Sequence, residues 1–401
     1  MTMTEDTLRF IREQRTADVR TLALQASRYP TVDMPVALTQ IAGWQVAREK
    51  IPSWAATDDI RYPAHLSMEQ CSSEATARYK SSIVKQASAS CRHLTDLTGG
   101  FGIDCAFLAP CFEKTTYVER QETLCAIAHH NFPLLGLSHI AVEHDDAIRY
   151  LQEMEPVDWL FLDPARRDGY GGKTVAIGDC EPDVSALEEL LLTKAHHVLV
   201  KLSPMLDLSL ALQQLHHVAE AHIVSVCGEC KELLLLLGAD APAMSDEVPI
   251  HCVNLQGNEV QQVCFTRSQE SALPCSYTTQ IGNYLYEPNA SLLKGGAYHY
   301  LSNRYRVEKL HPNSHLYTAD MYLPHFPGRR FKVESSCSFN KKDIKNMLGT
   351  IHKANLTVRN FPASVSDLRK RLKLSEGGEV YLFATTLADE SKVLIYCSKV
   401  T

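Results

Sequence analysis

From His93 onward, short apolar segments alternate with stretches of helical periodicity, and this rhythm restricts the fold more than any other feature of the chain. Seven segments have the character of strands, and the first six begin about 19 to 39 residues apart. This spacing leaves room for a helix in each connection, which is how parallel strands are joined. We therefore predict an α/β fold with a doubly wound, mostly parallel seven-stranded sheet covered on both faces. The segments are HLTDL, TTYV, HIAV, DWLFL, HVLVKL, HIVSV and LLLLL.

The last connection in this series differs from the others. Only the six residues CGECKE, 227–232, separate the sixth segment from the seventh. Six residues cannot hold a crossover helix, so we expect an antiparallel hairpin and an antiparallel last strand. A further strand pair is predicted at 250–255 and 260–265, turned at Gln256-Gly257-Asn258.

Short helices are expected at the N-terminal end, in a helical segment covering residues 1–68. Asp18 and Asp33 each precede apolar positions with helical spacing, and Pro35 follows in the first turn of the second helix. Another helix within residues 69–86 is expected to begin at Ser72 or Ser73, with an acidic residue in its first turn.

Composition suggests further domains after the sheet. The sheet domain is predicted to span residues 69–270, because proline, tyrosine and asparagine become frequent after about residue 272. A small ferredoxin-like α/β module is expected over 271–325, where tyrosines either pack internally or stack on bases. Residues 326–401 form a last small α+β domain that ends in the order strand, helix, strand, strand, with Ser364 and Asp367 at capping-box spacing.

Charge is distributed unevenly along the chain. The whole sequence has a net charge of −7, but from Met321 to the end 14 Lys and Arg stand against 7 Asp and Glu. The C-terminal part therefore carries +7 and the rest −14. This asymmetry indicates a separate polyanion-binding part, although a solvated charged surface explains the charge equally well.

The 13 cysteines are scattered singly except for Cys227 and Cys230. Such scatter suits reduced thiols in a cytoplasmic protein better than a disulfide framework. One CxxC pair without a second does not make a four-ligand zinc site, so we expect no metal. No apolar run approaches the ~18 residues of a membrane span, and the charged N-terminus has no secretory core. The oligomeric state is left open.

The glycine-rich turn in LTDLTGGFGIDCAFLA carries the strongest chemical signal. Gly99, Gly100 and Gly102 follow a strand and precede a helix, so the backbone can approach a ligand closely. A nicotinamide enzyme would need glycine where Cys105 stands, and Asp104 places a carboxylate where a pyrophosphate would sit. An acidic strand end before this turn suits a zwitterionic cofactor with a sulfonium and an amine.

At these motifs the sequence resembles the class I S-adenosylmethionine-dependent methyltransferases, over roughly Gln70 to Leu237. The resemblance implies a Rossmann-like fold and S-adenosyl-L-methionine as the cofactor. The acidic residue that closes TTYVE matches the one that holds the ribose hydroxyls in the family, and a carboxylate can accept from both. The DD pair in VEHDDA matches the acidic residue that binds the adenine amine. The implied cofactor-binding residues are Asp96, Thr98, Gly99, Gly100, Gly102, Glu119, Asp145 and Asp146.

The stretch FLDPARR occupies the position of the family's fourth motif, at the strand end that faces the substrate. Amine-methylating members have two prolines and an aromatic residue after the acidic or amide residue, whereas Ala165 and Arg166 follow Asp163-Pro164 here. The form is closer to D-P-P-R-x-G of uridine C5 methyltransferases, but Ser203 stands near the place of their nucleophilic cysteine. The resemblance therefore favours methylation of nitrogen or oxygen, with Asp163, Pro164 and Arg166 as catalytic residues.

A second resemblance covers Asn355 to Thr386, which is similar to the THUMP-like domain attached to some of these enzymes. It implies RNA binding through salt-sensitive contacts to the backbone. Near the fourth motif, two alternatives stay open for the cations, which either contact phosphate or neutralise neighbouring carboxylates. The predicted RNA-binding residues are Arg167, Lys201, Arg359, Arg369, Lys370, Arg371 and Lys373.

Together, these features predict an S-adenosylmethionine-dependent methyltransferase that modifies a nucleotide in tRNA or rRNA, with Asp163 positioning the acceptor. One alternative is an enzyme of the same cofactor class acting on a small molecule or a protein. Another is a non-catalytic RNA-binding protein with a vestigial cofactor fold. A nicotinamide dehydrogenase is disfavoured by Cys105.

Overall fold

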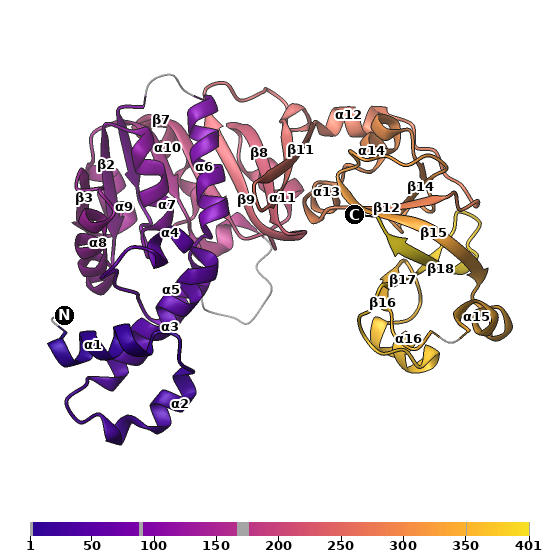
Figure 1. Ribbon diagram of the computed structural model, residues 1–401. Helices are drawn as coiled ribbons and strands as arrows, with labels where there is room; N and C mark the ends of the chain where they lie inside the picture. The colour runs from indigo at the N-terminus through magenta and orange to yellow at the C-terminus, as the bar shows by residue number, and fades with distance from the viewer. Residues whose placement is uncertain (1–2, 88–90, 167–175, 350, 401) are drawn as a thin grey trace. The chain divides into compact units, whose positions relative to one another are not determined.

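The computed structural model describes residues 3–87, 91–166, 176–349 and 351–400 (Figure 1). Their contacts divide the chain into two compact units, residues 1–219 with 234–241 and residues 220–233 with 242–401. Composition had suggested a boundary near residue 270. The strand pair 250–265 instead groups with the C-terminal elements, since Cys252 packs against Gly295 of a later helix.

The N-terminal segment is helical, as predicted. Asp18 and Asp33 are the N-caps of the second and third helices, each accepting a hydrogen bond from a backbone N–H three residues later. Phe10, Leu22 and Ile41 form a small apolar core. The helices are α1 (Glu5–Gln14), α2 (Val19–Leu24), α3 (Met34–Lys50), α4 (Pro52–Ala55) and α5 (His65–Gln70).

A second apolar cluster joins this segment to the sheet domain. Trp54 and Tyr62 pack with Phe101, from the glycine-rich loop, and with Phe132 of a later helix. The Asn131 side chain donates to the Arg61 carbonyl and accepts from its N–H. The long helix α6 (Glu74–Ala87) then leads into the sheet, and its first turn is capped by Ser73, one of the two predicted residues.

The large sheet has the strand order β11-β10-β8-β9-β7-β4-β1-β2-β3. All seven predicted strands are present, and β1, β2, β3, β4 and β7 pair in parallel. The predicted pair at 250–265 extends the sheet to nine strands. The strands are β1 (His93–Asp96), β2 (Lys114–Glu119), β3 (Ile140–His144), β4 (Val157–Leu162), β7 (Ala195–Leu202), β8 (Val218–Val226), β9 (Glu229–Gly238), β10 (Ile250–Gln256) and β11 (Glu259–Phe265).

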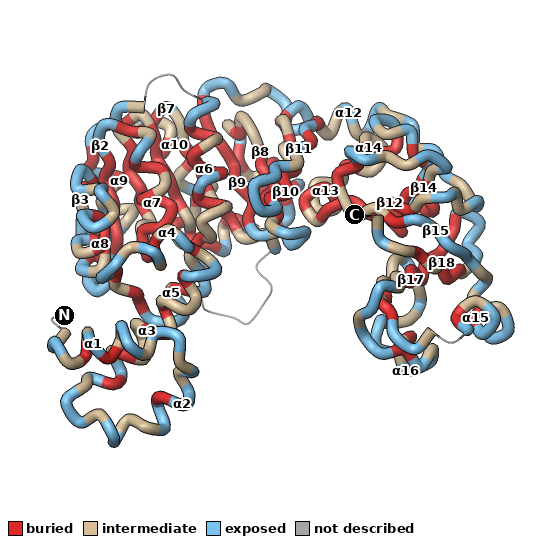
Figure 2. The backbone as a smooth tube through the Cα atoms, viewed as in Figure 1, coloured by how far each residue is buried: buried red, intermediate tan, exposed pale blue. Residues whose placement is uncertain are grey.

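The hairpin prediction agrees with this order, because β8 and β9 are neighbours joined by only two residues. A connection this short requires antiparallel strands. Helices connect the parallel strands, and most residues of β1, β2, β4 and β7 are buried (Figure 2). The connecting helices are α7 (Ile103–Leu108), α8 (Glu122–Leu134), α9 (Ala147–Glu153), α10 (Val184–Lys194) and α11 (Leu208–Gln214).

The C-terminal part contains a seven-stranded sheet in the order β13-β14-β12-β15-β18-β17-β16. Its last section has the predicted order of strand, helix, strand and strand, and Ser364 caps the helix. The long strand β15 pairs with β12 on one side and with β18 on the other. The strands are β12 (Tyr284–Pro288), β13 (Glu308–Lys309), β14 (Tyr317–Ala319), β15 (Gly328–Ser338), β16 (Asn355–Arg359), β17 (Val380–Thr386) and β18 (Lys392–Lys399).

Helices pack against this sheet, and the tyrosines of the region are used for internal contacts. Tyr286 is fully buried, and Tyr298 stacks on His315. The helices are α12 (Arg267–Ala272), α13 (Ala290–Gly295), α14 (Tyr298–Tyr305), α15 (Lys341–Leu348) and α16 (Val365–Leu372). Among the helices of the described residues, none combines the length and apolar character needed to cross a bilayer.

Candidate active site

The glycine-rich loop follows β1 and needs glycine for two different reasons. A Cβ on Gly99 would lie 2.2 Å from the Tyr117 ring, so no larger residue fits there. Gly100 and Gly102 have φ of +55° and +87°, in the left-handed region that favours glycine. The Tyr117 hydroxyl donates to the Gly100 carbonyl at 2.5 Å, which fixes the loop from below. A rigid main-chain cradle therefore stands at the carboxyl end of β1.

Asp96 ends β1 and is almost completely buried. Its Oδ1 accepts from the Thr98 N–H at 3.0 Å, whereas its buried Oδ2 has no hydrogen-bond partner among the described residues. Burial raises the pKa of Asp96 well above the ordinary value, and nearby carboxylates add to the rise. A buried acceptor without a donor fits a positively charged ligand group, which would also lower this pKa.

Glu119 ends the neighbouring strand β2 and faces the same loop. Its Oε2 accepts from the Gly100 N–H at 2.9 Å, and its Oε1 accepts from the Gln121 N–H at 2.8 Å. Each carboxylate oxygen has a second lone pair, so both can still accept from a pair of hydroxyls. These contacts fit the predicted ribose-binding role.

The two acidic residues after β3 have structural partners. Asp146 is the N-cap of α9 and accepts from the backbone N–H groups of Ile148 and Arg149. Asp145 forms an ion pair with Arg149, which holds the pKa of Asp145 below its ordinary value. The Asp145 N–H donates to the Glu119 carbonyl at 3.2 Å, so this turn is tied to the end of β2. Their predicted contact with adenine stays a prediction.

Asp163 follows β4 and is linked to the glycine-rich loop. Its backbone N–H donates to the Thr98 hydroxyl at 2.6 Å. Its carboxylate Oδ2 lies 2.5 Å from Lys201 Nζ at the end of β7. Burial raises the pKa of Asp163, while Lys201 acts in the opposite direction. The Asp163 side chain is 37% exposed, so the carboxylate can still be reached.

Behind Asp163 lies a buried cluster of charges that the sequence did not reveal. Lys80 Nζ is 3.1 Å from Asp104 Oδ1, and Ser72 donates to Asp104 Oδ2 at 2.7 Å. Lys201 Nζ is also 3.7 Å from Asp104 Oδ2. Burial alone would raise the pKa of Asp104, but Lys80 and Lys201 hold it below the ordinary value. Lys201 is thus placed to neutralise two neighbouring carboxylates, and its predicted contact with RNA stays a prediction.

One sequence signal could have indicated this cluster. Lys80 is fully buried on α6, and it lies three residues after Ala77 and four before Val84 on the same buried face. A lysine within the apolar stripe of a helix needs a buried anion. From the sequence alone, Asp104 was expected only to disfavour a bound pyrophosphate.

The rest of the fourth motif is described only in part. Pro164 is buried, and β5 (Ala165–Arg166) pairs with β6 (Cys180–Glu181). The side chain of Arg166 and the whole of Arg167 lie outside the described residues. Their predicted contacts stay predictions.

The predicted RNA-binding residues of the C-terminal domain fall into two groups. Arg359 contacts the buried Glu287 through two nitrogens, Arg369 lies 3.6 Å from Glu376, and Arg371 stacks over Phe339. Lys370 and Lys373 are exposed at the C-terminal end of α16, a position that also suits cations because of the helix dipole. Among these five residues, Lys370 and Lys373 are the two whose side chains extend into solvent and make no side-chain hydrogen bond or ion pair with the described part of the chain.

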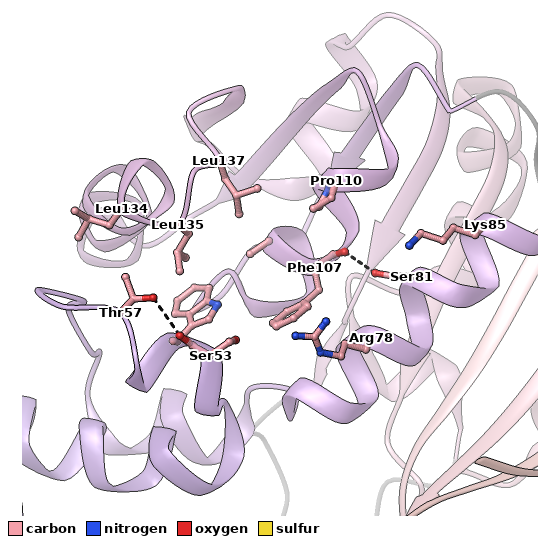
Figure 3. Close-up of a pocket in the computed structure, with 12 residues that line it drawn as sticks. Ser53, Thr57, Arg78, Ser81, Lys85, Phe107, Pro110, Leu134, Leu135 and Leu137 are labelled. Carbon is pink, nitrogen blue, oxygen red and sulfur yellow. Dashed lines mark hydrogen bonds between the residues drawn. The ribbon is translucent and has the colours of Figure 1, made fainter. Parts of the chain in front are cut away.

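A separate pocket of about 510 Å³ lies in the first unit, beside α6 (Figure 3). Trp54, Phe107 and Leu135 give it an apolar lining, and Arg78 and Lys85 add cations. None of the predicted site residues lines this pocket. The candidate site is instead the set of strand ends just described.

Comparisons with known proteins identify two C-terminal domains and one relative over the full length of the chain. Residues 284–327 match the family model of a ferredoxin-like domain, and residues 328–399 match that of a THUMP domain-like family. A crystal structure of a "putative methyltransferase from Porphyromonas gingivalis W83" is 36% identical, with full coverage of both chains and a TM-score of 0.87. No curated protein matches the sequence.

More distant structures match part of the chain. An rRNA methylase from Streptococcus thermophilus is 14% identical, with a TM-score of 0.30 and coverage of 40% of this chain and 93% of that one. A "putative methyltransferase" from Streptococcus mutans in complex with SAH is 12% identical, with a TM-score of 0.30 and coverage of 40% and 96%. The full-length match is the informative one, and by it the chain belongs to the class I S-adenosylmethionine-dependent methyltransferase family, among members with a C-terminal THUMP-like domain.

Proposed function

We propose that this protein is an S-adenosylmethionine-dependent methyltransferase that modifies a nucleotide in RNA. One observation carries the proposal. The Thr98 hydroxyl accepts from the Asp163 N–H, so the predicted cofactor loop and the predicted acceptor motif are held together. Methyl transfer needs the acceptor beside the cofactor at a fixed distance, and a direct bond between the two binding segments supports that requirement.

The residues of the first strand ends fit the proposed cofactor. The unpartnered Asp96 Oδ2 can accept from an ammonium, and the main chain is open beside Gly100, where a Cβ would meet only the Thr98 carbonyl oxygen, at 3.8 Å. Glu119 can hold the two ribose hydroxyls with the lone pairs that Gly100 and Gln121 do not use. When bound, S-adenosylmethionine supplies a methyl group already activated by its sulfonium.

Asp163 is the proposed acceptor-positioning residue. Lys201 contacts its Oδ2, and within the described part of the chain no hydrogen bond is made to its Oδ1. Oδ1 can therefore accept from an acceptor N–H or O–H and hold its lone pair in line with the transferred carbon. Positive charge that develops on a methylated nitrogen is stabilised by the same carboxylate.

RNA as the substrate rests on the C-terminal domain. Its match to a THUMP domain-like family and the +7 charge from Met321 onward support a polyanionic partner. Lys370 and Lys373 are the cations best placed for phosphate contacts, because the arginines nearby have protein partners.

The decisive experiment compares methylated nucleosides by mass spectrometry in RNA from a deletion strain and from complemented strains. We expect one methylated nucleoside to disappear and to return with the wild type but not with Asp163→Ala. If no nucleoside of tRNA or rRNA changes while the purified protein binds S-adenosylmethionine, the acceptor is a small molecule or protein. If calorimetry shows no cofactor binding but RNA binds, the protein is not an enzyme.

A further inference from the structure

Two histidines, a glutamate and a cysteine lie in one patch on neighbouring strands β8, β10 and β11, away from the residues used above. The strand register places His251 directly opposite His222 on one side and opposite Cys264 on the other. Glu220 lies two residues before His222 on β8, so it shares the same face of the sheet. The fold therefore brings together four side chains that commonly bind transition metals.

Three of the donor atoms form one close group, and the sulfur of Cys264 lies beside one of them. Glu220 Oε2 lies 3.1 Å from His222 Nε2 and 3.7 Å from His251 Nε2, and Cys264 Sγ lies 3.8 Å from the same His251 nitrogen. The donors of Glu220, His222 and His251 are all within 4.8 Å of one another. A tetrahedral zinc site has bonds of about 2.0–2.3 Å, which separates its donors by roughly 3.3–3.6 Å.

The rings of His222 and His251 are stacked, and the Nε2 atom of each lies near the Glu220 carboxylate. His222 and His251 are 4.6 Å apart at their centroids and inclined by 13°. His251 Nδ1, on the far side of the ring, lies 2.8 Å from the side-chain amide of Gln262. The amide of Gln262 can be placed in either of two orientations, because its oxygen and nitrogen are nearly indistinguishable. In the second orientation, Oε1 accepts a hydrogen bond from an Nδ1–H of His251. A histidine that binds metal through one nitrogen usually donates from the other to such a group.

The proposed ligands differ in their exposure to solvent. His222 is 3% exposed, whereas Glu220 is half-exposed and Cys264 lies at the surface. The site is therefore closed on the side of His222 and open to a metal ion from solvent on the side of Cys264.

We propose that Glu220, His222 and His251 bind one divalent transition-metal ion and that Cys264, beside His251, turns its side chain to become the fourth ligand. Zinc is the best match to two nitrogens, one oxygen and one sulfur. Binding forms four metal–ligand bonds, and the Cys264 thiol releases its proton to solvent. The ion joins three strands from the face of the sheet and adds a structural role to the proposed methyltransferase. The sequence predicts no metal because it has one CxxC pair without a second, whereas these donors come from three separate strands.

The test uses the full-length protein without a histidine tag, stripped of metal by a chelator and titrated with Zn(II) alone. We expect one zinc per chain and a higher melting temperature on binding. His251→Gln should abolish this binding, and Gln262→Ala should weaken it about 10- to 100-fold, the usual effect of losing the group that orients a ligand histidine. Gln261→Ala, on the adjacent position of β11, is the matched control and should bind zinc as the wild type does.

Cobalt(II) tests the thiolate. The wild type should show tetrahedral d–d bands and a sulfur-to-cobalt charge-transfer band, and Cys264→Ser should lose the second. Cys227→Ser, which removes another exposed cysteine, should keep both. A wild type that binds no zinc overturns the proposal, as does zinc binding that persists in His251→Gln but disappears in Cys227→Ser. If His251→Gln does not fold, the two other variants decide the question. The proposal is then overturned if Gln262→Ala binds zinc with unchanged affinity and Cys264→Ser keeps the cobalt spectrum of the wild type.

Discussion

The strand ends of the large sheet and the helix α16 of the C-terminal domain both carry lysines for which we predict a role, but the surroundings of these lysines differ. Lys80 and Lys201 are 0% and 11% exposed and are held by Asp104 and Asp163. Lys370 and Lys373 lie in solvent at the end of a helix. A buried cation has its geometry fixed by the fold, whereas an exposed one acquires a defined geometry only with its partner. Substitutions in the two regions should therefore differ in kind as well as in size.

The largest effect is expected at the buried cluster. Lys80→Met removes the nearer of the two lysines that face Asp104 and should lower the free energy of unfolding by about 3–5 kcal/mol, because it leaves a buried charge less compensated. Urea denaturation measures this change. Lys85→Met, on the exposed part of the same helix, should stay within about 0.5 kcal/mol of the wild type. Equal stability of the two variants would contradict the distinction between buried and exposed cations.

Asp163 should matter for turnover more than for cofactor binding. Asp163→Asn keeps the shape and the backbone bond to Thr98 but removes the charge, so kcat should fall about 10²- to 10³-fold. Single-turnover methylation of the identified RNA measures it, and calorimetry should show cofactor affinity near that of the wild type. Asp58→Asn, an exposed control, should leave kcat unchanged. Full activity of Asp163→Asn would remove this carboxylate from the mechanism.

Glu119→Gln should weaken S-adenosylmethionine binding about 10- to 100-fold, since an amide has only one accepting oxygen for the groups that Glu119 serves. Isothermal calorimetry gives the affinity. The neighbouring exposed Glu122→Gln provides the control and should bind normally. Equal affinities would mean that Glu119 is needed only for its bonds to Gly100 and Gln121.

The pH dependence of kcat should report the pair of Asp163 and Lys201. An ionised Asp163 is the active form, so activity is lost as the pH falls through its pKa. Lys201 lowers this pKa against the effect of burial, so Lys201→Met should move the acid limb to higher pH. A shift of one unit corresponds to about 1.4 kcal/mol. Lys114→Met, at an exposed site, should leave the profile in place, and an unmoved limb in Lys201→Met would show that Asp163 does not control it.

The smallest effect is expected for the exposed cations. Lys370→Ala combined with Lys373→Ala should weaken RNA binding several-fold and reduce the slope of log affinity against log salt by about 2, one for each phosphate contact. Arg359→Ala should lower stability through Glu287 with little change in this slope. If Arg359→Ala changed the slope more than the double lysine variant did, the phosphate contacts would lie at the arginines with protein partners and not at Lys370 and Lys373.

The sheet could be predicted because its information is local in the sequence. Strand length, helix spacing and the short connection before β9 are properties of short segments. The glycine-rich loop was recognisable because the spacing of its glycines is local, although the contacts that require Gly99 and Gly102 come from Tyr117 and Phe132 of the next βα unit. The ion pairs were not predictable, because Lys80, Asp104 and Lys201 come from three elements whose meeting depends on packing. The strand β15 was not predicted either, because most of its residues are polar or charged and exposed.

The pairing of β12 with β15 has a consequence for the history of the chain. The ferredoxin-like match ends at residue 327 and the THUMP domain-like match begins at 328, yet hydrogen-bonded strands from the two regions continue one sheet across that border. Gly328 sits so close to the Glu287 carbonyl that any side chain there would collide with it. A recombination event or an expression vector that divides the chain at this border would expose two unpaired strand edges, which favour aggregation. The two regions should therefore be inherited, and produced in the laboratory, as a single piece.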